Sequence, residues 1–117
     1  MMDFTERKVL ILVKNKPFGR IVASEGWRAA VGMFGMDHES QMLFIGDGVY
    51  GLMKDQDIVP IRMFKSTFES FDGIVFVSKK SLEERNIDVS EIFVEVQILE
   101  EADVAKTLVE NEVIITF

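Results

Sequence analysis

Cysteine is absent from this chain of 117 residues, and its absence excludes several kinds of chemistry. Without a thiol the chain can form no disulfide, offer no thiolate nucleophile and carry no persulfide of its own. Histidine is nearly absent as well, since His38 is the only one. A transition-metal site would therefore depend on carboxylates, and a Ser-His-Asp triad would depend on this one imidazole. We expect a solvated loop position for His38, no metal site and no cofactor.

Basic residues and long apolar segments are also scarce. Lys and Arg number 13 against 20 Asp and Glu, which gives a formal net charge of −7 and disfavours direct nucleic-acid binding. No apolar run approaches the roughly 18 to 20 residues that cross a bilayer. The acidic start MMDFTERKVLILV also lacks the basic segment of a signal peptide. We expect a cytoplasmic protein without membrane association, in which residues 1–117 form a single domain.

What the sequence has in abundance is short apolar runs rich in Val, Ile and Phe. They predict strands at residues 8–13, 41–46, 73–78, 92–99 and 113–117. The first three runs are almost continuously apolar, as expected where helices cover both faces of a sheet. Helical patterns separate the runs, so the predicted order is βαβαβαβαβ. The predicted fold is a three-layer α/β/α domain with a five-stranded, mainly parallel sheet.

Helical spacing marks the buried face of the connecting segments. The expected inward residues are Ala23, Trp27, Ala30, Val31 and Phe34 in the first helix, Ile61, Phe64, Phe68 and Phe71 in the second, and Val104, Ala105, Leu108 and Val109 in the last. Ser24 is expected to cap the first helix, and Pro60 suits the first turn of the second. After the third strand, Ser81 and Glu84 have the spacing of a capping box for a short helix that ends near Asn86.

The segment GDGVYG, residues 46–51, matches the G-x-G-x-x-G pattern of dinucleotide-binding turns. Three features favour a different interpretation. The segment follows the second strand, Asp47 would place a carboxylate beside the pyrophosphate, and the third strand ends in Ser78 instead of an acidic residue. We therefore predict a tight turn that needs glycine at positive φ, with Asp47 capping the turn that follows. A nucleotide- or flavin-dependent oxidoreductase is the enzyme-class alternative, although only Lys16, Arg20 and one glycine follow the first strand as a phosphate loop.

Ser78 stands where the third strand meets the next helix, at the edge of a parallel sheet where ligands commonly bind. A nucleophilic serine needs a base within hydrogen-bonding reach. The neighbouring Lys79 and Lys80 are expected on a solvated turn, where neither is a buried base. On chemistry alone we predict that Ser78 is not catalytic.

The chain has more Met and aromatic side chains than one thin sheet obviously covers. They are Phe18, Met33, Phe34, Met36, Met42, Tyr50, Met53, Met63 and Phe64. Ordinary core and a subunit interface are both open for them, because Met fills irregular core gaps and is enriched with aromatics at interfaces.

Four segments, in this order and at these spacings, resemble the DsrE/DsrF/DsrH sulfur-relay family: KPFGR (16–20), SEGWRAA (24–30), LFIGDGVYGLMKDQ (43–56) and SLEERNI (81–87). The resemblance runs from the first strand to the final VIITF and is strongest to the F-type (DsrF/TusC) subunits. Two positions depart from the family pattern. Ser24 stands where related sequences often have Arg, which weakens an anion contact there. Asn86 stands where they have Gly, and Asn still adopts the left-handed conformation that helix ends favour.

The resemblance implies a five-stranded parallel sheet between helices, and assembly of related subunits into trimers or hexamers. It implies a complex that passes persulfide sulfur to a small carrier protein, for sulfur oxidation or for 2-thiouridine formation in tRNA. The reactive cysteine of E-type subunits matches Ser78 in this chain, and serine cannot hold a persulfide. The implied function is a cysteine-free, non-catalytic subunit that scaffolds a persulfide-carrying E-type partner together with an H-type subunit.

The residues that we expect at a subunit contact or its pocket are Phe18, Trp27, Asp47, Gly48, Val49, Tyr50 and Ser78. Asp47 would fix its turn, and the apolar residues would bury surface. A binding-module alternative stays open, in which a stand-alone homo-oligomer of the same fold binds a small ligand near Ser78 and Asp47.

Overall fold

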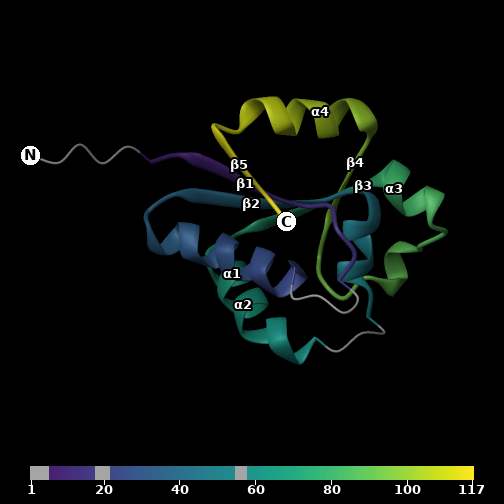
Figure 1. The fold of residues 1–117 in the computed structure, drawn as a ribbon, viewed down its shortest axis with the longest axis horizontal. Helices are drawn as coiled ribbons and strands as arrows, with labels where there is room; N and C mark the ends of the chain where they lie inside the picture. Colours follow the sequence, from purple (N-terminus) through teal and green to yellow (C-terminus); the bar gives the residue numbers. More distant parts are fainter. Residues whose placement is uncertain (1–5, 18–21, 55–57) are drawn as a thin grey trace, which may run out of the picture.

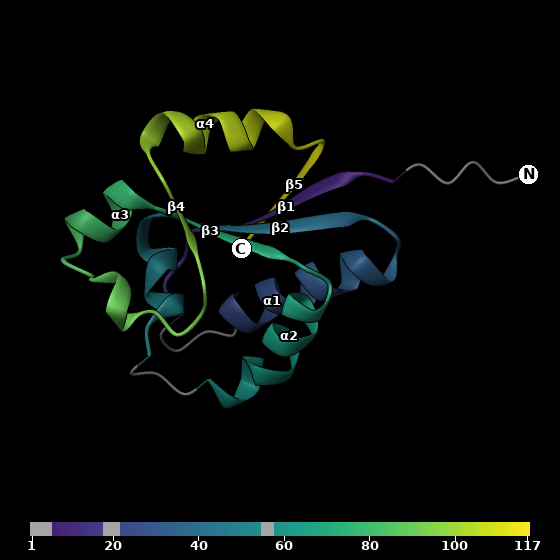
Figure 2. The ribbon, with the colours of Figure 1, turned by 180° about the vertical axis from the view of Figure 1, so that it is seen from behind.

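The computed structural model describes residues 6–17, 22–54 and 58–117, and these form a five-stranded parallel sheet with helices on both faces (Figure 1). The elements in chain order are β1 (Lys8–Val13), α1 (Val22–Gly35), β2 (Glu39–Phe44), the 3-10 helix η1 (Gly46–Leu52), α2 (Val59–Ser70), β3 (Ile74–Ser78), α3 (Lys79–Glu84), the 3-10 helix η2 (Val89–Glu91), β4 (Gln97–Leu99), α4 (Glu101–Glu110) and β5 (Val113–Thr116). The strand order is β4-β3-β2-β1-β5. Helices α1 and α2 cover one face and α4 covers the other, as Figures 1 and 2 show from opposite sides. The predicted three-layer fold is confirmed.

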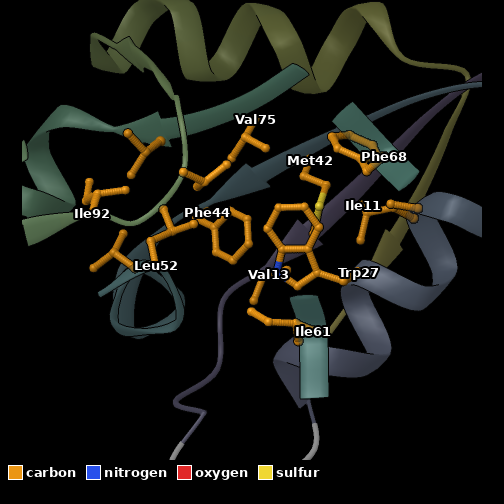
Figure 3. Close-up of a cluster of buried hydrophobic side chains, with 14 of the residues drawn as sticks. Ile11, Val13, Trp27, Met42, Phe44, Leu52, Ile61, Phe68, Val75 and Ile92 are labelled. Atoms are coloured by element: carbon orange, nitrogen blue, oxygen red, sulfur yellow. The ribbon is translucent and has the colours of Figure 1, made fainter. Parts of the chain in front are cut away.

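The core lies between the sheet and the α1/α2 layer, and Trp27 is at its centre (Figure 3). The Trp27 ring is fully buried, with its centroid 5.6 Å from that of Phe68 and 6.2 Å from that of Phe44. The strands contribute alternate residues to this cluster, such as Ile11 and Val13 from β1, because successive side chains of a strand point to opposite faces. The helical spacing of α1 thus predicted the central core residue.

The largest difference from the predicted strands is at β4, which pairs with β3 only over Gln97–Leu99. The preceding apolar residues turn away from the sheet. Ile92 forms an antiparallel bridge with Met53, and the Phe93 amide donates to the Leu52 carbonyl. These apolar side chains therefore pack against η1 and the residue that follows it, and they do not extend the strand. A run of alternating apolar residues therefore predicted burial correctly and strand length wrongly.

Several expected helix positions were also wrong. Ser24 lies inside α1, because the helix begins at Val22, so Ser24 is not the N-cap. Phe71 is 52% exposed, where it stacks on Phe34 at 5.1 Å between ring centroids. In α4, Ala105 and Val109 are exposed, whereas Val104 and Leu108 are half-buried. The side chain of Ala23 lies outside the described part of the chain. Pro60 is in the first turn of α2, as predicted.

None of the described helices is long and apolar enough to cross a bilayer. His38 lies half-buried in the connection before β2, where its Nδ1 accepts a hydrogen bond from the Arg7 amide. Within the described ranges, His, Asp and Glu side chains form no group of three that could hold a metal ion.

Candidate functional site

The candidate site is the edge of the sheet where the parallel strands end. β2 and β3 are neighbours in the sheet, so the chain that leaves β2 through Gly46 and Asp47 lies beside the chain that leaves β3 through Ser78. Gly46 has a φ of +53°, which turns the chain sharply out of β2 into η1 and favours glycine at this position. The prediction of a glycine-dependent turn here is confirmed.

Ser78 is the N-cap of α3 and is only 7% exposed. Its Oγ accepts a hydrogen bond from the Ser81 amide at 3.1 Å, which satisfies one of the unpaired donors at the start of the helix. The predicted capping role of Ser81 is therefore wrong. Ser81 lies inside the helix, and its Oγ accepts a hydrogen bond from the Gly46 amide at 2.9 Å, which ties α3 to the turn after β2.

Asp47 and Arg85 join the same two segments through an ion pair. The Arg85 Nη2 and Nε atoms donate to Asp47 Oδ1 at 3.0 and 3.2 Å, and Arg85 Nη1 donates to the Ser81 carbonyl at 3.1 Å. The two side chains are 21% and 40% exposed for Arg85 and Asp47. The predicted role of Asp47 as the cap of η1 is wrong, because the residue at that cap is Ile45, without a side-chain bond. Asp47 holds its turn through Arg85 instead.

Gly48 rests directly on the end of β1. A Cβ added to Gly48 would lie 2.1 Å from the Val13 carbonyl oxygen, so no larger residue fits without moving the backbone. The Gly48 amide already donates to the Ile45 carbonyl at 3.0 Å. A dinucleotide site needs free amides at such a glycine to receive the phosphates. The geometry of this turn therefore disfavours the nucleotide-binding interpretation of GDGVYG.

The two lysines after Ser78 are paired with carboxylates on the α4 side. Lys79 Nζ lies 3.0 Å from a Glu100 carboxylate oxygen, and Lys80 Nζ lies 3.0 Å from one of Glu101. The hydrogen bond with Glu100 raises the pKa of Lys79 above its ordinary value, and the bond with Glu101 does the same for Lys80. Both lysines are protonated near neutral pH and cannot serve as the general base that a nucleophilic serine needs.

The remaining predicted site residues are distributed between core and surface. Trp27 and Val49 are fully buried, Gly48 is buried, and Tyr50 is half-buried. Phe18 and the proposed phosphate-loop residue Arg20 lie outside the described residues. Contact of these residues with a partner stays a prediction. The structure brings Asp47, Gly48 and Ser78 to one edge, as the sequence predicts for residues that follow neighbouring parallel strands.

Sequence reasoning missed the roles of Arg85 and Ser81 as the residues that hold this edge together. A signal for Arg85 was present, because the carboxylate of Asp47 follows one strand and Arg85 ends the helix that follows its neighbour. Ser81 gave no comparable signal, since its spacing to Glu84 equally suits a capping box.

Two cavities lie away from Ser78. One of about 320 Å³ is beside the start of β3 and is lined by Glu69, Asp72, Gly73, Ile74, Val75, Val94, Glu95, Val96 and Gln97. A second of about 240 Å³ is lined by Met53, Lys54, Ser90 and Glu91. Neither cavity includes Ser78 or Asp47, so neither supports a ligand at the strand-end edge.

The fold defines a parallel α/β/α domain, and hydrogen bonds fix the edge of the sheet where its strands end. Among the described residues, this edge has no activated nucleophile. Comparison with known proteins identifies it further. The chain belongs to the DsrE/DsrF-like family, whose model matches residues 7–117.

The relatives of this chain include a protein named for sulfur oxidation. The intracellular sulfur oxidation protein DsrF of Allochromatium vinosum is 27% identical, and the alignment covers 99% of this chain and 100% of that protein. The crystal structure of the YchN protein of Escherichia coli shares the fold at a TM-score of 0.79 and 16% identity, over 95% of this chain and 99% of that one. A protein of unknown function from Methanobacterium thermoautotrophicum, MTH1491, matches at a TM-score of 0.68 and 12% identity, over 97% and 100%.

Proposed function

We propose that this chain is a cysteine-free, F-type subunit of a sulfur-relay complex, in which it holds a persulfide-carrying partner in place and does not itself carry sulfur. The single observation that carries the proposal is the state of Ser78. This residue lies at a strand end, its hydroxyl caps a helix, and the family resemblance matches it to the reactive cysteine of E-type subunits. The lysines that follow it are protonated and cannot act as its base, and a serine oxygen cannot accept sulfane sulfur.

The rigidity of the strand-end edge supports a scaffolding role. The side chains of Ser81, Asp47 and Arg85 join η1 to α3 through hydrogen bonds, so the edge is formed before any partner binds. A preformed surface lowers the entropic cost of association. The partners that we propose are an E-type subunit, which brings the reactive cysteine, an H-type subunit, and a small carrier that receives the sulfur, all in the cytoplasm.

Of the two pathways that the family resemblance allows, sulfur oxidation is the better supported. The relative DsrF is named for intracellular sulfur oxidation and is aligned over nearly the whole of this chain. We therefore propose sulfur oxidation as the pathway and keep tRNA 2-thiouridine formation as the competing outcome.

The test is co-expression with E-type and H-type reading frames from the same genome, followed by affinity purification and mass spectrometry of sulfane sulfur. We expect a complex in which persulfide is found on the partner's cysteine and none on this chain. The double variant Asp47→Asn/Arg85→Gln should lower recovery of the E-type subunit, whereas the exposed control Ser66→Ala on α2 should not. Transferable sulfur on the isolated chain, or no recovery of a cysteine-bearing relative, would contradict the proposal.

A further inference from the structure

The start of β1 is held by a side chain at a point where a parallel sheet would supply a backbone carbonyl. β1 and β2 pair in the register Lys8↔Glu39, and the Glu39 amide donates to the Arg7 carbonyl at 3.0 Å. If this register continued by one residue, the Arg7 amide would donate to the carbonyl of Asp37. Asp37 has a φ of +61°, however, which turns the chain away from the strand direction. The Arg7 amide donates instead to Nδ1 of His38, at 3.2 Å.

The end of α1 holds the His38 ring in this position. The backbone amide of His38 donates to the Met33 carbonyl at 2.9 Å, and the Asp37 amide donates to the Phe34 carbonyl at 3.1 Å. These bonds fix the turn between α1 and β2, so the half-buried imidazole is placed beside the start of β1 by the backbone around it.

A second contact reaches Arg7 from the opposite neighbour of β1. Arg7 Nη1 donates to Glu112 Oε2 at 3.2 Å, and Glu112 Oε1 accepts a hydrogen bond from the Lys8 amide at 3.3 Å. Glu112 directly precedes β5, which pairs with β1. Arg7 therefore joins the starts of β1, β2 and β5. The side chains of Arg7 and Glu112 are 53% and 45% exposed, so their ion pair contributes little.

The bond between Arg7 and His38 depends on the charge of the ring. Nδ1 accepts a hydrogen bond only while the imidazole is neutral, because both nitrogens of an imidazolium are donors. Imidazole is also the side chain whose ordinary change of charge falls between about pH 5 and pH 8. After protonation, an Nδ1–H would face the Arg7 N–H, and two donors cannot form a hydrogen bond. The bond is therefore present at the higher pH and lost at the lower pH.

The charged groups on the segments that meet here act in both directions. They are Glu6, Arg7, Lys8, Asp37, Glu39 and Glu112. The two bases disfavour an imidazolium, and the four carboxylates favour it. All six residues are exposed, so water and salt screen their effect on the ring. The loss of the acceptor at Nδ1 is local and is not screened in this way.

We propose that His38 is a pH-sensitive latch on the start of β1. With a neutral ring, Arg7 is bonded to the β2 side through both its amide and its carbonyl. With an imidazolium, the amide is released, and Arg7 is held through its carbonyl and through Glu112. The latch lies where the strands start, at the edge of the sheet opposite Ser78, so it does not depend on the proposed function.

The experiment follows the full-length chain by NMR between pH 8 and pH 5. At pH 8 we expect a scalar coupling across the hydrogen bond between the Arg7 nitrogen and His38 Nδ1, and this coupling should vanish as the ring becomes protonated. Hydrogen exchange of the Arg7 amide, corrected for the intrinsic effect of pH, should become roughly twofold to tenfold faster. The Gly46 amide, which donates to Ser81 Oγ at the opposite edge, is the internal control and should not change.

Two variants separate the latch from its surroundings. His38→Leu removes the acceptor, so the corrected exchange of the Arg7 amide should be fast and the same at both pH values. Glu112→Gln removes the ion pair and should keep the pH dependence. Circular dichroism melting checks that both variants fold.

Three results would overturn the proposal: a proton on His38 Nδ1 at pH 8, equal corrected exchange of the Arg7 amide at both pH values, or a pH dependence that survives His38→Leu. Loss of the pH dependence in Glu112→Gln would also reject the latch, because it would assign the effect to the ion pair.

Discussion

The indole N–H of Trp27 is a buried donor without a hydrogen-bond partner in the described structure. Such a donor costs roughly 1 to 3 kcal/mol, while the ring itself contributes a large buried area. Trp27→Phe should therefore lower the free energy of unfolding only a little, since it removes the unpaired donor along with some buried volume. Trp27→Ala should cost about 3 to 5 kcal/mol, because the cavity faces Phe44 and Phe68. Urea unfolding followed by circular dichroism measures both, and equal losses would show that the unpaired donor is irrelevant.

Ser78 has a measurable structural role that differs from a catalytic one. Ser78→Ala removes the acceptor for the Ser81 amide and should lower the free energy of unfolding by about 1 kcal/mol. Ser78→Thr keeps an acceptor oxygen and should recover most of this loss. Ser66→Ala, on the exposed side of α2, is the matched control and should not destabilise. A Ser78→Ala chain as stable as the parent in urea would mean that the cap is dispensable.

At the scale of elements, the two glycines Gly48 and Gly32 should respond to alanine in opposite directions. In η1, the added methyl of Gly48→Ala meets the Val13 carbonyl, so β1 and η1 must separate. We expect a loss above about 3 kcal/mol, comparable to severe overpacking. In α1, an added methyl at Gly32 meets nothing within 4 Å, and Gly32→Ala should stabilise by about 0.5 to 1 kcal/mol. Thermal and urea unfolding of both variants check the signs, and a tolerated Gly48→Ala would contradict the close packing.

The Asp88 cap at the start of η2 should make the stability of the chain depend on pH. Asp88 accepts a hydrogen bond from the Ser90 amide at 2.9 Å, and this bond lowers the pKa of Asp88 below its ordinary value of 3.8. Because the folded pKa is the lower one, the cap stabilises above pH 3.8 and its contribution is lost as the pH falls through the folded pKa. Asp88→Asn keeps an acceptor without titrating. Its melting temperature should lie below that of the parent at pH 7, and the difference should narrow below pH 3.8. A difference that is constant with pH would contradict this role.

Elements with strong periodicity were predictable from the sequence, and those set by tertiary contact were not. The spacing of Trp27 and Ala30 indicated the buried face of α1, and the continuous apolar runs of β1 and β3 indicated strands covered on both faces. The run at residues 92–99 predicted a long strand, but contact with η1 removes its first half from the sheet. Helix starts at Ser24 and Ser81 were wrong by a few residues, because α1 begins before Ser24 and because Ser78 is an equally suitable cap for α3.

For the molecule as a whole, the candidate site followed from topology and its internal bonds did not. Parallel strands must end at one edge, so the meeting of Asp47 and Ser78 was predictable. The pairing of Asp47 with Arg85 depends on where α3 ends and which way its last side chain points, which no local pattern specifies. The chemistry of Ser78 alone only excludes a catalytic role. The family resemblance adds the prediction that Ser78 stands at the position of the reactive cysteine of E-type subunits.

The sheet and α4 should differ in stability, since α4 has no buried residue whereas the central strands are buried. Segments with few buried apolar contacts open at lower free energy. In the isolated chain, the α4 amides should therefore exchange hydrogen faster than those of β1 to β3. The pairs Lys79–Glu100 and Lys80–Glu101 join the starts of α3 and α4, so Lys79→Gln/Lys80→Gln should speed exchange in α4 further and leave β2 unchanged. At high salt, where surface pairs are screened, the two chains should exchange alike. Exchange in α4 as slow as in β1 to β3 would contradict the lower stability expected of a helix without buried residues.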